Sequence, residues 1–186
     1  MSARVSTHKG APAESDQLVE LEVGNLYALL IYEGDPDSWN WAFYLPDPSL
    51  SPIGSSGIVF RVIRGCDSDG EIDWKFDNCP MDDVSTSVIA IIQLVDLSIV
   101  GDYNELADDI LLDEFTRVAR SSQIIHSDEF SSRSWFLDSI KTLQAHNMLT
   151  CDIRRLEREI CRFAFDAMDA YLHDEGWTTF TADSCY

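Results

Sequence analysis

The chain has 186 residues, of which 45% are hydrophobic and 11% aromatic, and this is enough for a single domain with a buried core. Thirty-three acidic residues against thirteen basic ones give a net charge of −20. A surface of this sign repels the phosphates of nucleic acids and the anionic lipids of membranes. We therefore expect neither nucleic acid nor a membrane among the partners.

The first twenty residues differ from the rest of the chain because they are largely polar. We expect residues 1–20 to form a disordered N-terminal arm without a secretory signal, and residues 21–186 to form one domain. The five cysteines are scattered and form no Cys-x-x-Cys pair. Such a pattern is typical of free thiols in a cytoplasmic protein rather than of a zinc site. We expect no metal and no cofactor.

Five segments in the first part of the domain have the composition of β-strands. They are short, rich in β-branched and aromatic residues, and separated by clusters of Gly, Pro, Asp and Ser. The last one is apolar on both faces, as a central strand is. Short turns between consecutive strands favour an antiparallel sheet over β–α–β units. The predicted strands are 25–32, 39–45, 58–63, 72–76 and 88–95.

Beyond residue 100 the apolar residues recur at helical spacing instead. This pattern predicts helices over residues 104–120, 132–145 and 152–172. Ser131 or Ser132 is suited to cap the second helix. Strands followed by helices predict an α+β fold in which a sheet of about five strands packs against three C-terminal helices.

The predicted strand at 39–45 has bulky side chains on both faces. Side chains alternate between the two faces of a strand. One face receives Trp39, Trp41 and Phe43, and the other receives Asn40, Ala42 and Tyr44. Neither face is suited to plain solvent, so one of them is a candidate lining for a hydrophobic pocket.

Five short motifs occur in a characteristic order along residues 25–150. They are Leu26-Tyr27, Asn40–Leu45, Ile58–Val62, Trp74–Phe76 and Ser131–Trp135. In this order they resemble a group of small fungal proteins of uncharacterised function, whose members carry His-Trp-Ala on the second motif and Asn-Cys-x-x-Trp on the last. The His-Trp-Ala strand followed by an Asn-Cys helix is in turn similar to the permuted papain-like acyltransferases of the lecithin retinol type. The resemblance implies a papain-like fold.

The resemblance also implies which positions carry the chemistry. The base position is Asn40 and the nucleophile position is Ser132. In such a pair, an imidazole holds a cysteine thiolate at a helix N-terminus and moves its proton. An asparagine has no basic nitrogen at neutral pH, and a serine without a base is a very poor nucleophile. We therefore expect the inherited mechanism to be lost.

Three interpretations of Ser132 remain open. It caps the helix, or it belongs to an altered active site in which His126, expected in a loop six residues upstream, replaces the missing base. In the third interpretation, it borders a pocket that binds a small molecule without covalent catalysis, and Asn40 suits that pocket because an amide both donates and accepts hydrogen bonds.

The leading functional hypothesis is an intracellular protein that binds a small apolar molecule between the sheet and the Ser132 helix. Any reaction would be a non-covalent isomerisation or cyclisation guided by Asn40, Tyr44, His126 and Ser132, because positioning alone lowers a barrier. The alternatives are a catalytically inactive interaction module and a Ser132/His126 hydrolase or acyltransferase. A homodimer is left open. The predicted substrate-binding residues are Trp41, Tyr44, Trp74 and Trp135.

Overall fold

The computed structural model describes residues 6–7, 21–35, 38–49, 56–66, 72–81, 87–173 and 175–185. A π-helical segment, Glu105–Leu111, leads into the first α-helix, and a 3-10 turn, Ser127–Glu129, follows that helix. The α-helices are α1 (Leu112–His126), α2 (Ser132–Ala145) and α3 (Ile153–Leu172). The strands are β1 (Ser6–Thr7), β2 (Asn25–Asp35), β3 (Ser38–Pro46), β4 (Gly57–Cys66), β5 (Ile72–Met81), β6 (Val88–Asp96) and β7 (Thr178–Thr181). Strand β1 falls within the predicted arm, whose other residues lie outside the described part of the chain.

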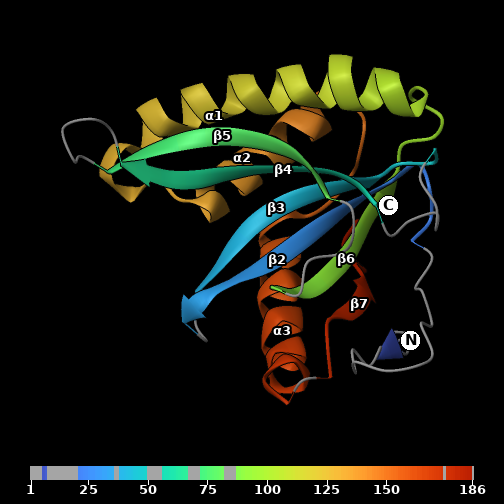
Figure 1. Cartoon of the computed structure of the whole chain (residues 1–186). Helices are drawn as coiled ribbons and strands as arrows, with labels where there is room; N and C mark the ends of the chain where they lie inside the picture. Colours follow the sequence, from blue (N-terminus) through green and yellow to red (C-terminus); the bar gives the residue numbers. More distant parts are fainter. Residues whose placement is uncertain are drawn as a thin grey trace.

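The strands form one sheet in the order β1-β7-β6-β2-β3-β4-β5 (Figure 1). All neighbouring pairs are antiparallel except β6 and β7, which are parallel. The prediction of an α+β fold is therefore confirmed. The prediction of a purely antiparallel sheet of about five strands is wrong, because β1 and β7 add to the sheet and β7 runs parallel to β6.

The position of β6 follows from its composition. Its first five residues are all buried, so it needs neighbours on both edges and cover on both faces. It lies between β2 and β7, whereas β5 forms the opposite edge of the sheet and carries exposed Lys75, Asn78 and Pro80. A proline suits an edge strand, which has no partner for the missing N–H. The helices between β6 and β7 carry the chain back, and this return makes the pair parallel.

All three helices contact the sheet through one cluster of buried side chains. Helix α1 lies along β4 and β5, α2 contacts β3 and β4, and α3 contacts β6 and β7 (Figure 1). Phe43 is at the centre of this cluster. Its ring stacks on Phe115 of α1 at 4.5 Å and on Phe136 of α2 at 4.2 Å, and it meets the edge of Trp135 at 5.6 Å. These offset and edge-to-face contacts fix how α1 and α2 sit on β3.

The opposite face of the sheet is also buried. Tyr27, Leu29, Ala42, Tyr44 and other residues of the central strands form a second cluster there, and Leu21 belongs to it. The alternation predicted for residues 39–45 therefore holds, since Trp41 and Phe43 belong to the helix-side cluster and Ala42 and Tyr44 to the other.

The helix boundaries agree with the predictions at α2 and α3 but not at α1. Ser131 caps α2 in a capping box with Ser134, and Asp152 caps α3 by accepting from two backbone N–H groups. Helix α1 continues to His126, beyond the predicted end at Arg120. The last turn carries Ile124 and Ile125, which are 82% and 72% exposed and so do not continue the apolar stripe that the prediction followed.

Candidate functional site

Asn40 and Ser132, the two positions singled out by the resemblance, lie close together where β3 meets the first turn of α2. The backbone N–H of Trp41, next to Asn40, donates a hydrogen bond to Ser132 Oγ at 3.2 Å. Asn40 and Ser132 are each 5% exposed. The capping box of Ser131 and Ser134 fixes the start of α2 at this point, because it satisfies free backbone groups of the first turn.

Strands β3 and β4 part at this place. Their registered pairing runs from Pro46–Gly57 to Phe43–Phe60 and ends there. Beyond it, Asn40 Nδ2 donates to the carbonyl oxygen of Val62 at 3.0 Å and to Glu33 Oε1 at 3.2 Å. Ser132 and Asn40 thus take over hydrogen bonds that a continued ladder would have made. Buried backbone groups require such partners, so both residues have a structural role.

One atom of Asn40 is left unsatisfied. Its Oδ1 is buried without a hydrogen-bond partner, and the indole Nε1 of Trp39 is in the same condition; among the described side chains these are the two such atoms. A buried amide oxygen without a donor is costly. A donor on a bound molecule would satisfy it.

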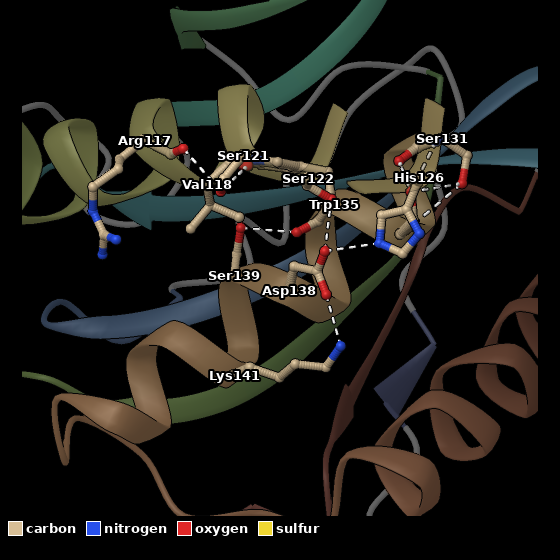
Figure 2. A network of polar contacts seen from close by, with 11 residues as sticks. Arg117, Val118, Ser121, Ser122, His126, Ser131, Trp135, Asp138, Ser139 and Lys141 are labelled. Atoms are coloured by element: carbon tan, nitrogen blue, oxygen red, sulfur yellow. Dashed lines mark hydrogen bonds and ion pairs between the residues drawn. The ribbon is translucent and has the colours of Figure 1, made fainter. Parts of the chain in front are cut away.

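His126 is held by a carboxylate rather than by Ser132. It is the last residue of α1, not a loop residue as expected. Its Nε2 lies 2.9 Å from Asp138 Oδ2, and Asp138 also accepts from Ser122 Oγ at 2.6 Å and from Lys141 Nζ at 2.7 Å (Figure 2). A carboxylate in this position orients an imidazole.

The interaction of Asp138 with its donors also changes its acidity. Burial by itself would raise the pKa of the Asp138 carboxyl. The hydrogen bonds from Lys141, Ser122 and His126 outweigh that effect and hold the pKa below its ordinary value of 3.8. The carboxylate is therefore charged throughout the physiological range.

No hydrogen bond joins His126 to Ser132 in the part of the chain that the structure describes. The serine oxygen accepts from the backbone of β3, and the imidazole Nε2 faces Asp138 on the second turn of α2. A general base needs to reach the proton that it removes. The arrangement thus contains an oriented histidine without a hydroxyl bonded to it.

Three of the four predicted substrate-binding aromatics are core residues. Trp41, Tyr44 and Trp135 are at most 3% exposed. Trp41 meets the ring of Phe136 at 5.4 Å, and the Trp135 indole donates to the carbonyl of Phe115 at 3.3 Å. The rings of Trp41 and Trp135 fill the space between β3 and α2, where the sequence predicts a cleft, whereas Tyr44 belongs to the cluster on the other face of the sheet.

A pocket of about 380 Å³ opens instead between α1 and strands β4 and β5. Its volume is within the range of small-molecule sites. Trp74, the fourth predicted aromatic, lines it, and the edge of its ring meets Phe130 at a centroid distance of 5.5 Å. The lining residues are Val62, Trp74, Lys75, Phe76, Thr116, Ala119, Arg120, Gln123 and Phe130.

Two lining residues, Val62 and Phe130, connect the Asn40–Ser132 region to the pocket. Val62 lines it, and the carbonyl of the same residue accepts from Asn40. Phe130 lines it two residues before Ser132. The α1 residues of the lining were missed because helical spacing shows which residues share a face, but not which strands that face will cover.

No other class of site is evident in the described segments. Within them, no group of three or more His, Cys, Asp or Glu side chains is arranged to hold a metal ion. None of the described helices combines the length and the apolar character needed to cross a membrane. Comparisons of the chain with protein-family models, with curated proteins and with solved structures found no match.

Replacing Ser132 by alanine tests its hydrogen bond to β3. We expect Ser132→Ala to lower the free energy of unfolding by about 1–3 kcal/mol, because the buried N–H of Trp41 loses its acceptor. Ser139→Ala is the matched control: it is equally buried on the same helix, but its hydroxyl only donates to the carbonyl of Trp135 within that helix, so its cost should stay within about 0.5 kcal/mol. Urea unfolding measures both, and equal costs would contradict this role of Ser132.

The hydrogen bonds of Asp138 make the free energy of unfolding depend on pH in the acid range. Because the folded pKa of Asp138 is lowered, its contribution is complete above the unfolded pKa and is lost as the pH falls through the folded value. We expect Asp138→Asn to cost about 1–3 kcal/mol at pH 7 and the difference from the unmodified protein to shrink below about pH 4. Urea unfolding between pH 7 and pH 3 measures this, with Asp166→Asn at an exposed position of α3 as control. If the free energies of unfolding of Asp138→Asn and of the unmodified protein differ by the same amount from pH 7 to pH 3, this role of Asp138 is refuted.

Proposed function

We propose that the protein binds a small, planar, largely apolar molecule in the pocket between α1 and β4–β5, without forming a covalent bond to it. The observation that carries the proposal is the lining. Trp74, Phe76 and Phe130 supply aromatic faces, and Val62 and Ala119 supply aliphatic surface. Aromatic and aliphatic side chains in one pocket wall suit a flat apolar ligand, because stacking adds to the gain from burial.

The pocket's chemistry favours non-covalent action. No Cys, Ser or His is among its lining residues, and these are the commonest nucleophiles and bases in covalent catalysis. The reaction class that such a pocket supports is an isomerisation or cyclisation, in which a shaped wall holds the reacting conformation. Asn40 is not among the lining residues; it pairs with Ile31 on the other face of the sheet, and its buried Oδ1 does not reach this pocket.

We infer that the surrounding arrangement is a degenerate papain-like one. The support for this is the contact of 3.2 Å between the Trp41 N–H and Ser132 Oγ, which brings the strand with the base position against the helix with the nucleophile position. A Ser132/His126 hydrolase has weaker support, since the bonds of these two residues go to Trp41 and Asp138. An inactive interaction module has weaker support than a ligand site because the pocket is open and unfilled by side chains.

The neutral fluorescent probe N-phenyl-1-naphthylamine tests the proposed binding. We expect saturable binding with one probe per chain, since the probe is flat, apolar and uncharged. Ala119→Trp fills the pocket and should abolish binding, whereas the same substitution at exposed Ala145 should leave it unchanged. Trp74→Ala, which opens the wall rather than filling it, should weaken binding about tenfold.

Circular dichroism of each variant separates loss of the pocket from loss of the fold. The proposal fails if the folded protein does not bind the probe, or if folded Ala119→Trp binds it as well as Ala145→Trp does.

A further inference from the structure

The polar part of the pocket is unlike the rest of the chain. Acidic residues outnumber basic ones by thirty-three to thirteen in the sequence, yet the lining contains Lys75 and Arg120 and no carboxylate. The nearby Asp73 carboxylate accepts a hydrogen bond from Gln123 Nε2 at 3.0 Å. Thr116, Arg120 and Gln123 therefore present α1 hydrogen-bond donors to the pocket.

Two arginines, Arg120 in the lining and Arg64 beside it, have no acidic partner among the residues that the structure describes. Arg64 is paired with Trp74 across β4 and β5, and its guanidinium lies over the indole ring, 5.1 Å from the centroid. Arg120 lines the pocket from α1. Both are exposed, and neither forms an ion pair or a hydrogen bond with any residue that the structure describes. By contrast, Arg61 and Arg133 are paired with Asp77 and Glu157.

We propose that the ligand of this pocket is a conjugated or aromatic molecule carrying one anionic group, a carboxylate or a sulfonate. This inference rests on the proposed function. The flat part lies against Trp74, Phe76 and Phe130, and the anion is held by Arg120 and Arg64. A guanidinium suits this role because its planar fork donates two parallel hydrogen bonds to such a group. Lys75 is adjacent to Trp74 in β5, so its side chain leaves the opposite face of the strand.

A pair of matched probes tests the charge. 1-Anilinonaphthalene-8-sulfonate has the same ring system as N-phenyl-1-naphthylamine plus one sulfonate. We expect it to bind several-fold more tightly than the neutral probe at low salt, and this advantage should shrink as the salt concentration rises. Arg120→Gln and Arg64→Gln should each weaken sulfonate binding about fivefold and leave the neutral probe unaffected. Arg162→Gln is the control, because Arg162 is also exposed and lies over an aromatic ring, that of Phe163.

The outcomes separate this inference from the proposed function. Equal affinity for the two probes, or an equal loss of both in the arginine variants, would overturn the anionic ligand while the pocket remains. Absence of neutral-probe binding to the unmodified protein would overturn the pocket itself.

A different observation concerns two thiols at the other end of the molecule. Cys151 and Cys185 face each other in an isolated antiparallel bridge, so their thiols are close enough for each to shift the pKa of the other. Directly opposed residues in an antiparallel bridge have the Cα separation that a disulfide needs. Both backbones are held: the Cys151 carbonyl accepts from Gln144 Nε2 at 2.7 Å, and the neighbouring Ser184 N–H donates to Glu159 at 3.1 Å.

We propose that Cys151 and Cys185 form a reversible disulfide when the protein meets hydrogen peroxide. The Cys151 thiolate attacks the peroxide and becomes a sulfenic acid, and the departing hydroxide takes up the proton that the thiol released on ionising and leaves as water. The Cys185 thiol then attacks that sulfur, and a second water leaves as the disulfide forms. Two thiols lose two electrons and two protons in total, and one peroxide accepts them.

The surroundings favour this pair over the other described cysteines. The hydrogen bond from Cys185 holds the pKa of Cys151 below its ordinary value, and the same bond together with burial raises the pKa of Cys185. Burial raises the pKa of Cys79 and Cys161. Since the thiolate is the reactive form, oxidation should begin at Cys151.

Peroxide treatment followed by peptide mass mapping without reduction tests the disulfide. We expect two of the five thiols to disappear, a linked peptide containing Cys151 and Cys185, and a thermal midpoint higher by roughly 5 °C or more. Dithiothreitol should reverse all three changes. Cys185→Ser should abolish the link and leave Cys151 as a higher oxide, whereas Cys161→Ser should form the link normally. The proposal is overturned if the thiols of Cys151 and Cys185 both survive peroxide treatment. It is also overturned if Cys151 of the unmodified protein becomes a higher oxide without forming the link.

Discussion

The parting of β3 and β4 is the constraint on which the rest of the arrangement depends. Where a ladder stops inside a protein, its backbone groups still need partners. Here the Trp41 N–H is satisfied by the first residue of α2 and the Val62 carbonyl by the Asn40 side chain. The first of these bonds ties the start of α2 to β3, and the second ties β3 to β4. The pocket lies beyond this point, between α1 and strands β4 and β5.

The aromatic residues divide between two tasks according to how completely their rings are enclosed. Around Phe43, the rings of Phe115, Trp135 and Phe136 pack so closely that no room remains for another molecule. Trp74 contacts the ring of Phe130 and the Arg64 guanidinium, and it also borders the pocket. A stretch of aromatic residues in a sequence therefore does not distinguish a core from a binding wall. The difference arises from which helix covers the strand and how far it extends.

Elements with strong local signals were predicted well from the sequence. Helices α2 and α3 have clear apolar stripes and polar caps at Ser131 and Asp152, and local chemistry of this kind does not depend on the rest of the fold. Strand β7 was not predicted, because four residues carry little periodicity and their pairing depends on α3 returning the chain to β6. The proximity of Asn40 and Ser132 was anticipated through the resemblance. The pocket was not, because it is formed by residues of α1, β4 and β5 that no short-range pattern links.

The parallel pairing of β6 with β7 has a consequence for the order in which the chain can fold during synthesis. Strand β6 is among the most apolar in the protein, yet one of its edges stays unpaired until three helices have been made and β7 emerges from the ribosome. An apolar strand with an open edge is a site for pairing with other chains. The nascent protein thus passes through a vulnerable interval that ends only with β7, and removing the segment from Thr178 onward would make that interval permanent.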